Sequence, residues 1–228
     1  MGCNGSDIRR LILASGSPRR RQLISLLGLP FSIKTARVDE TPLAGEPPTE
    51  LVLRVSQAKA FAVDNARSDE LIVAADTIVA VDGQVLGKPA DPDEAVRMLR
   101  LLRGRSHLVY SAISVWHTTS RRMVCGLAES TVWMRNYSDE EIAAYVDSGD
   151  PLDKAGAYAI QHPGFDPVAR VEGCWLTVVG LPLCHLGRML SGLGVVIPAS
   201  VPRACQAFNQ RACTLSPAIL RGASEYGV

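Results

Sequence analysis

Residues 11–20, with the sequence LILASGSPRR, predict a buried strand, a tight turn and the start of a helix. Leu11–Ala14 is a short apolar run bounded by polar residues, which is typical of a buried strand. Ser17 can cap a helix that has Pro18 as its first residue, and Gly28 can end that helix. The strand, turn and helix together indicate an α/β fold.

The turn Ser15–Arg20 is the first candidate binding segment. A helix N-terminus presents unpaired N–H groups and the positive end of a dipole, and Arg19 and Arg20 add guanidinium groups that can hold phosphate oxygens. Gly16 removes a Cβ where backbone must approach a ligand closely. From this segment alone, an ordinary capped helix with solvated arginines is an equally good interpretation.

The rest of the chain predicts a mixed α/β domain. Short apolar or alternating runs predict strands at 31–35, 71–73, 78–81, 84–86, 107–116, 123–133 and 175–179, and spacing and capping signals predict helices at 51–62, 91–104 and from 138 onward. We therefore expect a mixed sheet with flanking helices over residues 11–194, after a flexible extension at 1–10. Residues 195–228 lack clear periodicity and are expected to be a weakly packed C-terminal extension.

Composition excludes several classes of partner. The 228 residues are 47% hydrophobic and 21% charged, with a formal net charge of +1, so no overall field attracts nucleic acid or an acidic membrane surface. No apolar run approaches the roughly 20 residues of a membrane helix. The six cysteines contain no Cys-x-x-Cys pair, and the four histidines lack ligand spacing, so we expect a cytoplasmic protein without a cysteine–histidine metal site.

Asp76 and Thr77 form the second candidate site, because a carboxylate between apolar runs is costly to bury without a partner. A catalytic or metal-binding role fits this position, although an aspartate that bonds its own backbone at a strand end is the commoner case. Glu40, Lys59 and Lys88 are weak candidates when each is taken alone, since such side chains are usually solvated.

Residues 153–161, DKAGAYAIQ, form a further candidate, because small residues there permit close approach of the backbone. A tight loop with a surface ion pair is the plain alternative. The chain contains neither a Gly-x-x-x-x-Gly-Lys-Ser/Thr loop nor a Gly-x-Gly-x-x-Gly fingerprint. A kinase, a P-loop ATPase or a dinucleotide oxidoreductase is therefore disfavoured.

Taken together and in order, these segments closely resemble the Maf family of nucleoside triphosphate pyrophosphatases. The resemblance runs from about Leu11 to Leu190. Its motifs are ASGSPRR at 14–20, ARVDE at 36–40, Lys59 within AKA, AADT at 74–77, GKP at 87–89, DKAGAYAIQ at 153–161 and VVGLP at 178–182.

The resemblance implies an inosine triphosphatase-like fold with a nucleotide cleft between two lobes. It also implies hydrolysis between the α and β phosphates, a divalent metal cation (Mg²⁺ or Mn²⁺) and a possible homodimer. By the same resemblance, Asp76 is the proton acceptor and, with Glu40, faces the metal. The residues expected to face phosphate are Ser15, Arg19, Lys59 and Lys88.

The combination of Arg20, Thr77 and Gln161 resembles the branch of the family that acts on dTTP and UTP. An amide such as that of Gln161 can both donate to and accept from a uracil or thymine edge. Two other hypotheses stay open: a pyrophosphatase for modified or methylated nucleotides, and a noncatalytic nucleotide-binding regulator of cell division.

Overall fold

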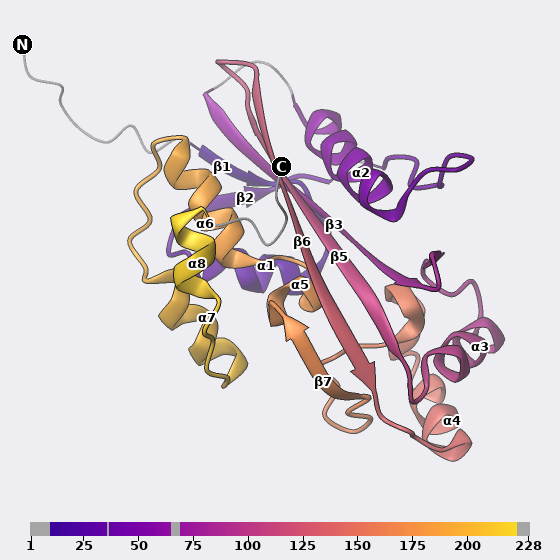
Figure 1. Cartoon of the computed structure of the whole chain (residues 1–228). Coiled ribbons are helices and arrows are strands. Elements are labelled where there is room, and N and C mark those ends of the chain that lie inside the picture. Colours follow the sequence, from indigo (N-terminus) through magenta and orange to yellow (C-terminus); the bar gives the residue numbers. More distant parts are fainter. Residues whose placement is uncertain (1–9, 36, 65–68, 223–228) are drawn as a thin grey trace, which may run out of the picture.

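A seven-stranded mixed sheet forms the centre of the molecule, and helices flank it (Figure 1). The structure is a computed structural model that describes residues 10–35, 37–64 and 69–222. The strand order is β2-β1-β3-β5-β6-β7, and β4 pairs with β3 outside this path. The predicted mixed α/β architecture is therefore confirmed. The extension predicted at 1–10 lies outside the described residues, except for Arg10, which begins β1.

The elements have the following bounds. The strands are β1 (Arg10–Leu13), β2 (Phe31–Ile33), β3 (Glu70–Val81), β4 (Gln84–Leu86), β5 (Ser106–His117), β6 (Arg122–Met134) and β7 (Val168–Gly173). The α-helices are α1 (Pro18–Ser25), α2 (Pro48–Ala62), α3 (Pro92–Leu102), α4 (Asp139–Asp147), α5 (Trp175–Val179), α6 (Leu183–Gly192), α7 (Val201–Asn209) and α8 (Ser216–Arg221). Two short 3₁₀ helices are η1 (Asp150–Asp153) and η2 (Ala155–Ala157).

The first three strands of the sheet create a crevice at the end of β1. β1 pairs in parallel with β2 on one side and with β3 on the other. Leu13 belongs to the core cluster that includes α1, whereas Ile12 belongs to the cluster that includes Ala60 of α2, so the two helices cover opposite faces. In open α/β sheets, ligands bind beyond the carboxyl end of a strand at such a switch point.

Three long antiparallel strands, β3, β5 and β6, extend past the end of β1 and join two lobes (Figure 1). One lobe contains β1, β2, α1 and α2, and the other contains α3, α4 and the 3₁₀ helices. Along this stretch Asp76 pairs with Ala112 and Thr77 pairs with Ser111. Successive side chains of a strand point to opposite faces, so Asp76 and Thr77 lie on opposite sides of β3.

Two local expectations were wrong. The runs at 71–73 and 78–81 belong to one strand, so Asp76 lies within β3 rather than at a junction. Residues 175–179 form the helix α5 rather than a strand, and the late strand is β7 instead. Hydroxyl groups of the sheet fix α5, because Ser111 and Ser130 donate hydrogen bonds to backbone carbonyls of Thr177 and Cys174, at 2.7 and 3.0 Å.

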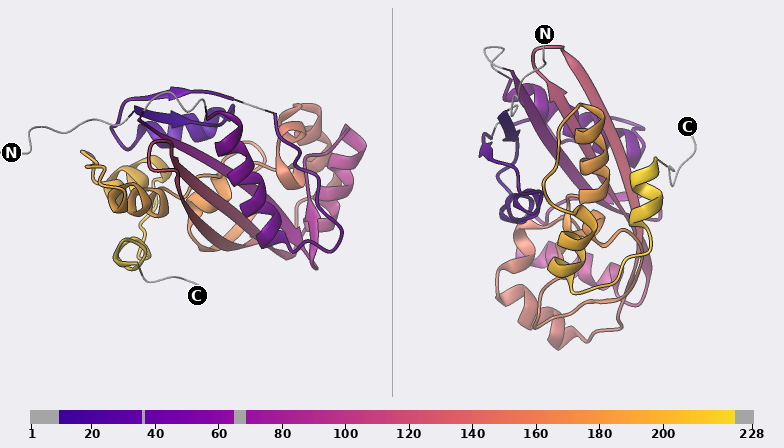
Figure 2. Two further views of the ribbon diagram at one scale, coloured as in Figure 1. Left: turned by 90° about the horizontal axis from the view of Figure 1, so that it is seen from above. Right: turned by 90° about the vertical axis from the view of Figure 1, so that its left-hand side faces the viewer.

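The C-terminal segment also differs from expectation, because it folds into α7 and α8 and packs on α6. Both views in Figure 2 show these three helices together on one side of the molecule. Val201, Cys205 and Ile219 are buried members of the main core cluster. The segment is therefore packed, and its apolar residues take part in the core.

Candidate active site

A cavity of about 980 Å³ lies between the two lobes, at the carboxyl end of β1. Its walls come from the turn before α1, two residues of α2, the centre of β3, the loop after β4, the 3₁₀ helices and the end of α5. The predicted site residues that line it are Ser15, Arg19, Arg20, Glu40, Lys59, Asp76, Thr77 and Lys88. Segments far apart in the chain thus meet at one cavity.

The N-terminus of α1 forms one wall. Ser17 caps the helix, and its Oγ accepts a hydrogen bond from the backbone N–H of Arg20 at 3.4 Å. The Oγ of Ser15 accepts from the N–H of Ser17 at 3.2 Å. The positive end of the helix dipole and the nearby Arg19 therefore border the cavity, an arrangement that favours an anion.

Lys59 joins the two predicted acidic residues. Its Nζ lies 2.7 Å from Asp76 Oδ1 and 2.8 Å from Glu40 Oε1. The Asp76 side chain is 10% exposed and that of Glu40 is 52% exposed, so the group lies at the boundary between protein and solvent. One ammonium thus holds two carboxylates close together beside the cavity.

The pKa of Glu40 is lowered from its ordinary value. Burial alone raises this pKa, but the hydrogen bond and charge of Lys59, and then the charges of Lys88 and Arg20, outweigh it. Glu40 is therefore an ionised carboxylate at neutral pH.

Arg20 lies against the protein rather than in solvent. Its Nε donates to the carbonyl of Gly180 at 3.0 Å, its Nη1 to that of Ala75 at 2.6 Å and its Nη2 to Thr77 Oγ1 at 3.1 Å. Burial lowers the pKa of Arg20, and the charges of Asp76 and Glu40 oppose that shift. Arg20 thus connects α1, β3 and the end of α5, which differs from a solvated arginine face.

The loop that carries Lys88 is held against the second lobe. The backbone N–H of Gly156 donates to the carbonyl of Gly87 at 3.0 Å. Gly156 has a φ of +68°, and a Cβ there would lie 3.0 Å from the Val79 side chain. Glycine is therefore required for this close approach, which places the exposed Lys88 beside the cavity.

Lys154 is a cavity residue that the sequence did not single out by itself. Its side chain is 6% exposed and forms ion pairs with Asp150, at 2.9 Å, and with Asp153. Asp150 also accepts a hydrogen bond from the Tyr145 hydroxyl at 2.6 Å. Within DKAG, Lys154 is thus buried and braces the second lobe through Asp150, whereas the Asp153 side chain is 74% exposed.

Gln161 does not line the cavity. It is exposed and lines a second, smaller pocket of about 270 Å³, together with Trp175 and Arg211. The guanidinium of Arg211 stacks on the Trp175 ring at 3.8 Å. A direct role of Gln161 toward a base in the main cavity therefore stays a prediction without geometric support.

The carboxylates of Asp76 and Glu40 suit a hard divalent cation. Mg²⁺ in proteins is usually held by one or two carboxylates together with substrate phosphates and water. Across the described residues, no group of three or more His, Cys, Asp or Glu side chains could hold a metal ion by itself. The donor set therefore fits a cation that shares its ligands with a bound phosphate.

Comparison with known proteins gives consistent matches over most of the chain. The family model described as Maf-like protein matches residues 10–193. A relative from Pelotomaculum thermopropionicum named dTTP/UTP pyrophosphatase is 44% identical over 82% of this chain and 98% of its own length. Proteins with the same name from Moorella thermoacetica and Anaeromyxobacter dehalogenans are 45% and 46% identical, covering 82% and 85% of this chain and 96% and 98% of their own lengths.

Among solved structures, the Ham1 protein of Staphylococcus aureus aligns with 70% of this chain and 80% of its own. The TM-score is 0.43 and the identity is 14%, which is too distant to carry a conclusion. No described helix is long and apolar enough to span a membrane.

Proposed function

This chain belongs to the Maf family, and from that premise we propose that it hydrolyses dTTP and UTP to the nucleoside monophosphate and pyrophosphate. Two features support the proposal. The relatives that match almost their whole length carry the name dTTP/UTP pyrophosphatase. The cavity also combines cationic side chains, a helix N-terminus and paired carboxylates, and polyphosphate cleavage uses such groups to stabilise charge and to activate water.

The observation that carries the proposal is the group of Lys59 with Asp76 and Glu40. In the proposed reaction, Asp76 accepts a proton from the attacking water, and the bond between the α and β phosphates breaks. One water is consumed, and pyrophosphate leaves with the bonding electron pair. Lys59, Lys88 and Arg19 stabilise the negative charge that develops on the phosphates.

We propose that Asp76 and Glu40 also hold a divalent cation, Mg²⁺ or Mn²⁺, whose remaining ligands come from the substrate and water. When bound, such an ion offsets phosphate charge and lowers the pKa of water. Lys59 keeps the two carboxylates together and reduces their mutual repulsion.

The replacement Asp76→Asn tests the proposed role of Asp76. We expect the variant to fold and to lose at least about 100-fold in kcat for dTTP, since general base catalysis typically contributes about 10²–10⁴-fold. The measurement is the initial rate of pyrophosphate release with Mg²⁺ or Mn²⁺.

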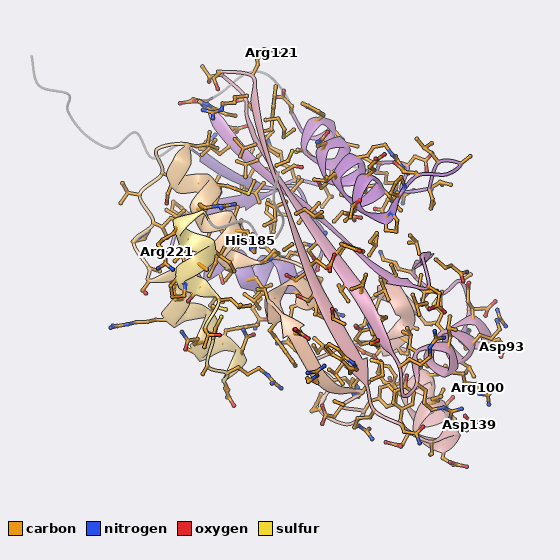
Figure 3. All side chains as sticks on the ribbon, viewed as in Figure 1. Asp93, Arg100, Arg121, Asp139, His185 and Arg221 are labelled. Carbon is orange, nitrogen blue, oxygen red and sulfur yellow. The ribbon has the colours of Figure 1, made fainter. Side chains whose placement is uncertain are left out.

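The matched control is Asp93→Asn, which changes an exposed carboxylate in the first turn of α3 that does not line the cavity; Figure 3 labels it at the edge of the molecule. It should retain the wild-type rate. Equal rates for Asp76→Asn and the wild type would remove Asp76 from the role of base.

Assays of the wild-type protein also test the other two hypotheses. Faster cleavage of a methylated or otherwise modified nucleotide than of dTTP and UTP would favour a pyrophosphatase for modified nucleotides. Binding of UTP without any metal-dependent turnover would favour the noncatalytic regulator.

We further propose a cytoplasmic location and a homodimer. The five cysteines in the described part of the chain are free thiols, which suits a reducing compartment. Light scattering on the purified protein tests the dimer, and a mass of one chain would contradict it.

A further inference from the structure

A chain of hydrogen bonds runs from Arg20 through two hydroxyl groups into the protein interior. Arg20 Nη2 lies 3.1 Å from Thr77 Oγ1, and Thr77 Oγ1 lies 2.8 Å from Ser111 Oγ. Ser111 Oγ in turn lies 2.7 Å from the backbone carbonyl of Thr177. The chain therefore connects α1, β3, β5 and α5.

The chemistry of its two ends fixes the direction of every bond. A guanidinium can only donate, and a carbonyl oxygen can only accept. The single proton of Ser111 is therefore donated to the Thr177 carbonyl, so Ser111 must accept the proton of Thr77. Thr77 in turn accepts from Arg20, and its own proton is unavailable to a ligand.

Thr77 consequently presents only an acceptor to the cavity that it lines. A hydroxyl oxygen has two lone pairs, and Arg20 occupies one of them. A phosphate oxygen is also an acceptor and cannot donate a hydrogen bond to the remaining lone pair. A ligand N–H group can donate such a bond.

The face of β3 that carries Thr77 offers apolar side chains against which a nucleobase can pack. Thr77 lies on the face of β3 that carries Val79, and Val109 and Val179 also line this part of the cavity. The charged group of Asp76 and Lys59 lies on the opposite face. On its own face Thr77 thus stands between apolar side chains and the Arg20 guanidinium, which already occupies one of its lone pairs, whereas Asp76 and Lys59 border the cavity from the opposite face.

We infer that Ser111 is a positioning residue that sets base selectivity. By accepting the Thr77 proton, it makes Thr77 Oγ1 an acceptor for a ring N–H, which uracil and thymine carry at N3 and cytosine does not. Ser111 is fully buried and does not line the cavity, so it acts only through Thr77. The inference rests on the proposed function and explains how its site distinguishes bases.

The experiment measures equilibrium binding of two non-hydrolysable nucleotides, α,β-imido-dUTP and α,β-imido-dCTP, to the full chain with Mg²⁺. The wild type should prefer the uracil nucleotide. In Ser111→Ala, Thr77 can turn its proton toward cytosine N3. The Kd of the cytosine nucleotide divided by the Kd of the uracil nucleotide should therefore fall by about tenfold, chiefly through tighter cytosine binding. A purely structural defect would weaken both nucleotides equally.

Two variants control for side effects. Ser111→Thr keeps the hydroxyl and should retain the wild-type ratio. Ser114→Ala removes another fully buried β5 hydroxyl, one that bonds Ser56 Oγ at 2.7 Å on the opposite face of the sheet, and should also leave the ratio unchanged.

Thr77→Val tests the same claim if Ser111→Ala does not fold, because valine keeps the shape of threonine without an oxygen. Its Kd ratio should fall toward one. An unchanged ratio in Ser111→Ala or in Thr77→Val, or equal weakening of both nucleotides, would overturn the inference and leave the proposed hydrolysis intact. A wild type that binds neither nucleotide would contradict the proposed function as well.

Discussion

Among the individual residues, one lysine holds two acids beside the cavity. Two carboxylates that face one site repel each other, and a shared ammonium offsets that repulsion. Lys59 is suited to this task because it comes from α2, the helix that covers the same face of β3 as Asp76. Its side chain is 15% exposed, so solvent screens the ion pairs only in part.

The replacement Lys59→Met should shift the pH dependence of the reaction. The Lys59 hydrogen bond and charge are the largest influences that lower the pKa of Glu40, so their removal raises that pKa. Glu40 then ionises only at higher pH, and the acid limb of the kcat/KM profile for dTTP should move to higher pH. Lys34→Met, which removes an ammonium paired with Glu70 outside the cavity, is the control. If the acid limb of Lys59→Met stays at the wild-type pH, Lys59 does not set the pH dependence of the reaction.

At the scale of elements, the loop between β2 and α2 positions Glu40 and depends on a second ion pair. Arg54 Nε donates to Glu46 Oε1 at 2.6 Å, and Arg54 Nη2 donates to the carbonyl of Thr41 at 3.0 Å. Pro42 of this loop lines the cavity. The loop is thus tied to α2 at one end of the site.

The Arg54 hydrogen bond, with a further one from the Leu43 backbone, lowers the pKa of Glu46 to about 2. Because the folded-state pKa is depressed, this stabilisation is fully present above the ordinary value of 4.5 and is lost as the pH falls toward about 2. A carboxyl ¹³C NMR titration should give Glu46 a midpoint near pH 2. A midpoint near 4.5 would show that the loop is not held by this pair.

Local signals predicted most of the elements that build the site. Ser17 and Pro18 predicted α1, and stretches rich in β-forming residues predicted β5 and β6, because caps and propensity act within a few residues. The sequence could not place α5, since its five residues WLTVV suit a strand, whereas burial of Leu176 and Val179 in the core and hydrogen bonds from sheet hydroxyls accompany the helix. Tertiary contacts of this kind override local preference.

The sequence predicted which residues form the site but not how they are arranged in space. The family resemblance grouped Asp76, Glu40, Lys59 and Gln161 in one site. The fold places the first three beside one cavity and puts Gln161 in another pocket. The direction of the bonds at Ser111 depends on contacts between residues 34 and 66 positions apart, which no local pattern encodes.

At the scale of the whole molecule, the cavity and the C-terminal helices are separate parts of one fold. Every residue that lines the cavity precedes Leu181, whereas α7 and α8 cover α6 on another side (Figure 2). The family match ends at residue 193, before these helices begin. Their packing therefore contributes to stability without contributing to the cavity wall.

Truncation after Gly194 should lower stability and spare the site. Full burial of a Val or Ile side chain stabilises by about 1.5–3 kcal/mol, and Val201 and Ile219 would both be lost. For a chain of this size we expect the Tm to fall by roughly 6–24 °C. Below that Tm, the truncated protein should keep the wild-type KM for dTTP. An unchanged Tm, measured by differential scanning calorimetry, would contradict the packing role.

The identity of the reaction products tests the proposed hydrolysis of dTTP. The full chain is incubated with dTTP and Mg²⁺ or Mn²⁺, and the products are identified by ³¹P NMR and mass spectrometry. Hydrolysis between the α and β phosphates predicts dTMP and pyrophosphate in equal amounts. The appearance of dTDP and orthophosphate instead would contradict the proposed reaction.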